Sequence, residues 1–488
     1  MTANSDSSSA ISATRAKTFL FYGGMVFAAV VIFFVIRSVG ADLAAPPAES
    51  VRAPAAGQAI NTLFHGLLAL AVIIVTARLV GTAVGLIGQP TVIGEVCGGI
   101  MLGPSLLGYI APGLYAQLLP PSLGSFLGVY AQLGVILYLF LVGLELDLGV
   151  LRDSGHAALA ISHASIILPF LLGAGLALVL YPVLSTADIS FTVFALFVGV
   201  SLSVTAFPVL ARILTDRRIS KSSMGVIALT CAAIDDVTAW CLLALVVSIA
   251  HDRASDAIRT VALTLAFVFV VLGLVAPLAR RMIPRIDRSE NLTRTGLSVV
   301  FIAMLASAMT TEYIGIHGFF GAFLFGAIIP HESRLARGLN ERLDDIVAVL
   351  FLPAFFAYTG MRTQIALVSG LENWLLCGLI ILVACLGKFG GTLIAARLSG
   401  LKWRDSAALG ILMNTRGLVE LIVLNLGLDL GILSPKLFTM LVIMALVTTF
   451  LTTPILQLLL RKNPWVERAP SRVFDGASSH IRVGPMAG

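Results

Sequence analysis

Charged residues are scarce in this chain, making up 12% of its 488 residues, whereas soluble domains carry about 25%. No charged side chain occurs between Glu95 and Glu145. This composition leaves too little solvated surface for a soluble enzyme, and a chain that is 58% apolar is not disordered. About 20 apolar residues in a row cross a bilayer. We therefore predict an all-α polytopic membrane protein and not a soluble enzyme.

Cysteine is also rare, and the five cysteines show neither disulfide-framework nor zinc-finger spacing. All lie inside apolar runs, which predicts small buried side chains: Cys97, Cys231, Cys241, Cys377 and Cys385. We expect no cofactor. The net charge of +6 could indicate a nucleic-acid partner, but in a membrane protein it more often reflects basic cytoplasmic loops. The expected surroundings are a lipid bilayer, without nucleic acid.

Apolar runs predict fourteen membrane spans, at 18–36, 59–80, 90–107, 124–146, 157–181, 189–213, 222–250, 260–279, 295–311, 313–330, 346–361, 373–396, 406–428 and 437–460. With the N-terminus in the cytoplasm, most Lys and Arg residues fall in cytoplasmic segments. Those on the opposite side are few: Arg37, Arg52, Arg253, Arg259, Arg362 and Lys436. The positive-inside rule then favours a multi-pass protein of the cell (inner) membrane with a cytoplasmic C-terminus.

The chain divides into three predicted regions. Residues 1–58 comprise an N-terminal helix and an Ala/Pro-rich linker, residues 59–460 the membrane domain, and residues 461–488 a short basic cytoplasmic tail. Val39-Gly40-Ala41 could serve as a signal-peptidase site. The preceding apolar run is long for a signal peptide, which favours a retained helix.

Ionisable residues at membrane depth are costly and therefore mark candidate functional sites. Asp235 and Asp236 lie near the middle of the predicted span 222–250, which holds no other charge. Adjacent residues point about 100° apart on a helix, so the two carboxylates can face different partners. Lys388, within the span 373–396, is expected to pair with Asp235. The alternatives are two purely structural carboxylates and a lysine that extends to the membrane interface.

Two predicted spans carry interrupting residues in corresponding places of the two halves of the chain. In 189–213, the hydroxyl residues Ser203 and Thr205 precede Pro208. In 406–428, polar residues and a glycine interrupt the apolar run: Asn414, Thr415, Arg416, Gly417 and Glu420. Paired broken helices are typical of inverted-repeat transporters, in which half-helix ends form an ion site near the membrane midplane.

Four polar residues are less decisive as site residues. Glu95 is a candidate for the cytoplasmic entrance. Arg416 and Glu420 lie four residues apart, so an ion pair is as plausible as contact with a transported ion. His317 lies close to the predicted outer face, and we expect it to pack against its neighbours.

Taken together, these segments resemble the monovalent cation:proton antiporter family 2, which contains Kef-type efflux systems, plant cation/proton exchangers and bacterial sodium/proton antiporters with paired aspartates. The resemblance covers residues 89 to about 460. It rests on QPTVIGEVCGGIMLGPS (89–105), FLVGLELD (140–147), TAFPVLARIL (205–214), AAIDDVTAW (232–240), GIHGFFGAFLFGAIIP (315–330) and NTRGLVELIVLN (414–425). The last motif is similar to the plant branch, and the paired aspartates are similar to the bacterial branch.

The resemblance implies thirteen core helices from residue 59 onward, arranged as a dimerisation subdomain and a core subdomain of a homodimer. It implies that 189–213 and 406–428 are crossed, discontinuous helices. Asp236 would bind the transported Na⁺ or K⁺ or a proton, Asp235 would pair with Lys388, and Thr205 would supply an oxygen at the crossing. The helix at 18–36 is additional to this pattern. The regulatory domain of potassium efflux systems does not follow residue 460, so we do not expect nucleotide or glutathione gating.

The predicted function is antiport of a monovalent cation, Na⁺ or K⁺, against protons. A channel or an organic-ion exporter on the same scaffold is the alternative, and an intramembrane aspartyl protease is a remote one. If the Asp235–Lys388 pair opens on cation binding, two protons move per cation and transport is electrogenic, which we favour. If the pair stays closed, exchange is one for one.

Overall fold

The computed structural model describes residues 5–41, 43, 62–145, 156–186, 188–217, 219, 222–250, 254–286 and 294–460. These residues are helical or in turns and loops, with no strand among them. The all-α prediction is confirmed. The predicted tail and nearly all of the Ala/Pro linker lie outside the described residues.

The helices follow one another along the chain. They are α1 (Ser5–Gly40), α2 (Thr62–Leu86), α3 (Thr91–Leu102), α4 (Leu107–Ile110), α5 (Pro112–Leu118), α6 (Gly124–Glu145), α8 (His156–Leu184), α9 (Phe191–Ser203), α10 (Phe207–Asp216), α11 (Ser223–Ala250), α12 (Ala254–Val270), α13 (Ala276–Ile286), α14 (Arg294–Ile314), α15 (Gly318–Ala327), α16 (Arg334–Ile346), α17 (Leu352–Arg362), α18 (Leu371–Leu398), α19 (Trp403–Met413), α20 (Leu418–Asp429) and α21 (Pro435–Leu460).

Twelve helical segments of the described chain are long and apolar enough to cross a membrane, or thirteen if the bent pair α19–α20 is counted as one span. The predicted span 313–330 is longer than the helix that the structure has there. That helix is α15 alone, and it is preceded by left-handed backbone at Gly315 and His317. The predicted span 346–361 also differs, because α16 and α17 join through a π-helical turn. α16 is strongly amphipathic, and the polar residues on one face lower its mean hydropathy. A search for apolar runs therefore does not detect this helix.

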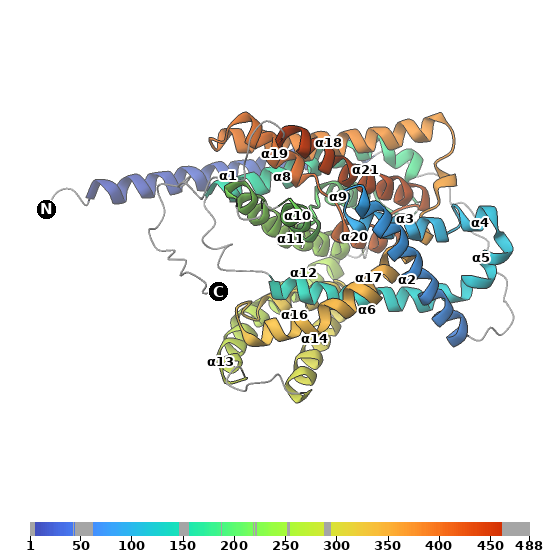
Figure 1. The fold of residues 1–488 in the computed structure, drawn as a ribbon. Helices are drawn as coiled ribbons and strands as arrows, with labels where there is room; N and C mark the ends of the chain where they lie inside the picture. Colours follow the sequence, from blue (N-terminus) through green and yellow to red (C-terminus); the bar gives the residue numbers. More distant parts are fainter. Residues whose placement is uncertain are drawn as a thin grey trace.

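The helices pack in two groups (Figure 1). In the core group, α18 lies along α8, α8 lies along α9, and α11, α19, α20 and α21 complete the packing, with α10 against α11. In the scaffold group, α2 lies along α3, α17 along α3 and α6, and α15 between α6 and α14. Helix α1 packs against α8 and α9 of the core group. The predicted N-terminal helix is therefore present, and it packs against the core group.

The close approach of α18 to α8 depends on two small residues. A Cβ atom at Gly387 would lie 2.7 Å from Pro169 Cα, and one at Gly391 would lie 2.5 Å from the Ala164 carbonyl oxygen. Small residues four apart let membrane helices pack backbone to backbone. The consequence is that Lys388, which follows Gly387, is buried against α8.

Candidate functional site

Both interrupted spans are broken in the structure, and the two breaks meet. Residues 204–206 separate α9 from α10, and residues 414–417 separate α19 from α20, which are bent by 43°. The Ala206 N–H donates to the Thr415 carbonyl oxygen at 3.1 Å. A Cβ atom at Gly417 would lie 2.6 Å from a methyl group of Val209, so only glycine fits this approach. The two predicted discontinuous helices therefore cross at their breaks.

Two basic side chains satisfy the carbonyl groups at the end of α9. The Arg416 guanidinium donates to the carbonyl oxygens of Ser201, Leu202 and Val204 at 2.5–3.0 Å. The Lys388 ammonium donates to the Ser203 carbonyl oxygen at 2.6 Å. The last carbonyls of a helix lack intrahelical partners and carry partial negative charge. Arg416 and Lys388 therefore supply both the missing donors and the complementary charge.

Asp235 is surrounded by donors. Its Oδ1 atom accepts from the hydroxyl of Ser162 at 2.5 Å, and its Oδ2 atom accepts from Ser165 at 2.8 Å and from Thr205 at 2.7 Å. Lys388 Nζ lies 3.0 Å from the same Oδ2 atom, which gives the predicted pair. The third ammonium hydrogen bond goes to the Ser165 carbonyl oxygen at 3.0 Å. Both partners of this pair are fully buried and satisfied.

Asp236 has a different environment. It is 2% exposed, and its Oδ1 atom has no hydrogen-bond partner among the described residues. The backbone N–H of Phe207, the first residue of α10, lies close to its carboxylate. A helix N-terminus carries partial positive charge and favours an anion. Asp236 is therefore a buried carboxylate that keeps one oxygen available for a further ligand.

The other predicted site residues of the second break surround the crossing. Arg416 Nη1 lies 3.1 Å from Glu420 Oε2, so these residues form the ion pair that their spacing allowed. Glu420 Oε1, Asn414 Oδ1 and Thr415 Oγ1 are buried without a partner in the described part of the chain. These are all oxygen ligands, which suit hard monovalent cations.

The remaining predicted site residues, Ser203, Thr205 and Glu95, have other surroundings. The Ser203 hydroxyl donates to the carbonyl oxygens of Gly199 and Ile166, and so helps to hold the break. The Thr205 hydroxyl is directed to Asp235. Glu95 is 8% exposed on α3 and lies near Arg78 and Arg212. Glu95 therefore lies where the scaffold group faces α10 of the core group.

Ser162 and Ser165 are the site residues that sequence analysis missed. They lie three residues apart on α8 and both reach Asp235. The available signal was weak: two hydroxyl residues inside an apolar run. Serine is common in membrane helices, where it usually bonds to its own backbone, so the sequence did not distinguish these two.

No group of three or more His, Cys, Asp or Glu side chains that could hold a resident metal occurs in the described ranges.

Residues 69–462 match the family model described as sodium/hydrogen exchanger, transmembrane. The chain is 42% identical over 397 residues to the Na⁺/H⁺ antiporter NhaS4 of Synechocystis. The matched region covers 81% of this chain and 97% of that protein. It is 39% identical to cation/H⁺ antiporter 19 of Arabidopsis thaliana and 36% identical to K⁺/H⁺ antiporter 1 of Saccharomyces cerevisiae, covering 80% and 81% of this chain. The matches cover only 49% and 46% of those two longer proteins.

Among solved structures, the sodium proton antiporter MjNhaP1 of Methanocaldococcus jannaschii shares the fold, with a TM-score of 0.60 at 15% identity over 82% of this chain and 99% of that one. The relatives are transporters, so the intramembrane protease hypothesis is wrong. The chain belongs to the sodium/hydrogen exchanger family of membrane antiporters.

Proposed function

We propose that this protein exchanges a monovalent cation, Na⁺ or K⁺, for protons by alternating access, with Asp236 as the carboxylate for which they compete. The observation that carries the proposal is the contrast between the adjacent aspartates. Asp235 is saturated by four donors, whereas Asp236 keeps a buried oxygen that has no partner within the described ranges of the chain. The relatives include a Na⁺/H⁺ antiporter and a K⁺/H⁺ antiporter, which supports both cations as candidates.

Competition at one carboxylate is sufficient for exchange. Burial disfavours the charged carboxylate, so Asp236 is stabilised either by a proton or by a bound cation. Both loaded forms are nearly neutral, whereas the empty anion is costly in a low-dielectric environment. The loaded site can therefore cross to the other side, and the empty site crosses poorly. This difference couples cation movement to proton movement.

The two helix groups supply the moving parts. All residues of the crossing belong to the core group, so we propose that this group moves as a unit against the scaffold group. The scaffold group would also form the interface of a homodimer. We place the protein in the cell membrane with its C-terminus in the cytoplasm, as the distribution of Lys and Arg favours.

The contacts of Lys388 favour one proton per cation, the alternative to our first expectation. All three ammonium hydrogens have acceptors, namely Asp235 and the carbonyl oxygens of Ser165 and Ser203. Release of its proton would leave one of these acceptors without a donor. Because an unsatisfied buried polar group raises the free energy, the closed Asp235–Lys388 pair has the lower free energy throughout the cycle.

The experiment is proton flux in proteoliposomes that carry a pH gradient and an internal pH-sensitive dye. Addition of Na⁺ or K⁺ should dissipate the gradient in the native protein, and Li⁺ serves as a further test of ion size. Asp236→Asn should reduce exchange below about a tenth while leaving a folded protein, since an amide neither carries a proton nor balances a cation. Cation flux without proton movement would instead indicate a channel, and flux driven by organic ions alone would indicate an exporter.

A further inference from the structure

A second polar cluster joins the two helix groups at the predicted outer end. Arg362, the last residue of α17, donates to Asp429 Oδ1 at 2.6 Å and to Asn425 Oδ1 at 3.1 Å. The Asn425 amide donates to the Thr359 hydroxyl at 2.7 Å. Thr359 and Arg362 belong to the scaffold group, whereas Asn425 and Asp429 belong to the core group. We call these four residues the outer latch.

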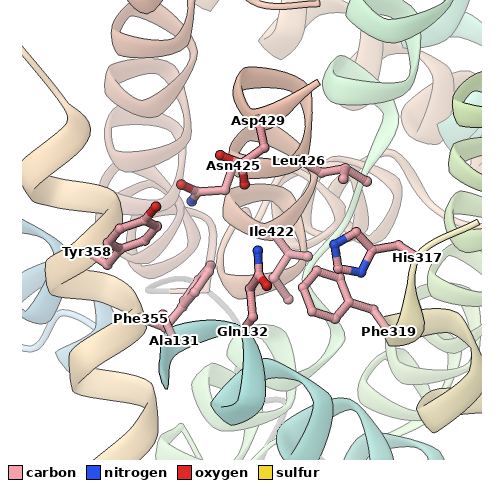
Figure 2. Close-up of a pocket in the computed structure, with 10 residues that line it drawn as sticks. All are labelled: Ala131, Gln132, His317, Phe319, Phe355, Tyr358, Ile422, Asn425, Leu426 and Asp429. Carbon is pink, nitrogen blue, oxygen red and sulfur yellow. The ribbon is translucent and has the colours of Figure 1, made fainter. Parts of the chain in front are cut away.

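The boundary beneath the latch is nearly closed. A cavity of about 20 Å³, room for a single water molecule, lies between α20 and the scaffold helices. Figure 2 shows Asn425 and Asp429 of α20 on one side of this cavity, with Tyr358, Phe355 and Gln132 on the other. The Arg362 guanidinium also lies over the Tyr358 ring, 5.1 Å from its centroid. Polar contacts and aromatic side chains together close this end.

Helix α20 connects the latch to the crossing. It begins at Leu418, directly after the second break, and ends at Asp429. Twelve residues of α-helix span about 16 Å between the first and last Cα atoms. Any displacement of the crossing relative to the scaffold group must therefore be transmitted to Asn425 and Asp429.

We propose that the outer latch holds the outer end of the boundary closed in this conformation and opens once in each transport cycle. The Arg362 and Asp429 side chains are 22% and 37% exposed, so water replaces their contact at low cost. A contact that forms and breaks repeatedly needs this property. The inference rests on the proposed antiport, because alternating access is what requires this end to open.

The first test prevents the latch from opening. The five native cysteines are replaced, and Thr359→Cys is combined with Asn425→Cys, since these two side chains are in contact. Copper–phenanthroline forms the disulfide, and mass spectrometry verifies it. Oxidation should remove about nine-tenths of exchange, and dithiothreitol should restore it. The two single-cysteine proteins, treated identically, are the controls. A verified disulfide with unchanged exchange would overturn the proposal.

The second test measures opening without transport. Ile422→Cys, in the same background, places a thiol at the cavity on α20. A membrane-impermeant maleimide is added from the Arg362 side. Asp429→Asn should raise the rate at which it labels the introduced thiol about fivefold, the ratio expected for loss of an exposed ion pair. Asp188→Asn, an exposed residue in the connection between α8 and α9, is the matched control. Equal labelling rates in the two variants would contradict the latch.

The two tests separate this proposal from the proposed function. If the native protein shows no cation-driven proton flux, antiport fails, and the labelling experiment still reports whether Asp429 controls access. If flux is normal but neither the disulfide nor Asp429→Asn has an effect, the latch alone fails.

Discussion

The charged cluster at the helix crossing and the outer latch use the same kinds of side chains in opposite ways. At the crossing, the pairs Asp235–Lys388 and Arg416–Glu420 are fully buried, and both lie inside the core group. At the latch, Arg362 and Asp429 are partly exposed and connect the core group to the scaffold group. Burial and the helices that are joined therefore distinguish the two clusters more clearly than composition does.

This difference has an energetic consequence. Removing one partner of a buried ion pair costs about 3–5 kcal/mol, whereas an exposed pair contributes about 0–1 kcal/mol. Contacts inside the core group are therefore strong enough to keep the crossing intact while it moves. The partly exposed Arg362–Asp429 pair between the groups is weak enough to exchange with water in every cycle.

The comparison is tested most severely by replacing one positively charged side chain in each cluster. Lys388→Met should lower the free energy of unfolding by about 3–5 kcal/mol, because it leaves Asp235 as an uncompensated buried charge. Arg362→Met, the matched change at the latch, should cost about 1 kcal/mol or less. Thermal unfolding midpoints of the two detergent-solubilised proteins would show the difference. Equal shifts would mean that burial does not separate the clusters.

Replacing one arginine with lysine in each cluster sharpens the comparison. Arg416→Lys keeps the charge but loses the planar fork that reaches three carbonyl groups of the first break. We expect a loss of about 2 kcal/mol in stability and a parallel fall in exchange rate. Arg362→Lys should have a much smaller effect on stability, because water can replace its contacts. Proteoliposome flux and unfolding midpoints for both variants test this ranking; a larger loss in Arg362→Lys would reverse it.

A smaller effect is expected from one hydroxyl group at the crossing. Ser162→Ala removes the donor to Asp235 Oδ1 and should lower stability by about 1–2 kcal/mol. Ser298→Ala is the control, since the hydroxyl of this exposed serine donates to the Arg294 carbonyl oxygen of its own helix, and a change within about 0.5 kcal/mol is expected. Unfolding of purified protein is the measurement. An unchanged midpoint in Ser162→Ala would show that Asp235 does not depend on the Ser162 hydroxyl.

The smallest expected effect is that of membrane voltage. With the Asp235–Lys388 pair closed, one cation exchanges for one proton and no net charge moves. If the flux assay shows exchange of Na⁺ but not of K⁺, an imposed potassium diffusion potential with valinomycin should then leave Na⁺-driven proton flux unchanged. Vesicles with the potential clamped at zero provide the control. A flux that responds to the potential would show that the pair opens and that two protons are transported.

Much of the fold could be predicted from the sequence, because the bilayer requires about 20 apolar residues for each spanning helix. The two breaks were also predictable, since proline, glycine and polar residues interrupt apolar runs at Pro208 and Gly417. The short helix α15 and the polar helix α16 were not recognised correctly. A hydropathy count measures composition and does not detect a chain reversal at Gly315 or an apolar stripe on a polar helix.

The site was predicted in part. Asp235, Lys388, Arg416 and Glu420 stood out because charges at membrane depth are costly, and the structure places each in an ion pair. Ser162 and Ser165 were missed, because a serine that serves a distant carboxylate has the same local pattern as one bonded to its own helix.

The sequence by itself determined that the chain spans the membrane, where most of the spans lie and which buried residues carry charge, since these follow from local composition and the cost of desolvation. Only the tertiary structure decided which aspartate is saturated and which retains an available oxygen. It also decided that the carbonyl end of α9 faces Arg416 and Lys388, and that Arg362 meets Asp429. These pairings join residues far apart in the chain, and such contacts depend on how helices pack rather than on the sequence around each residue.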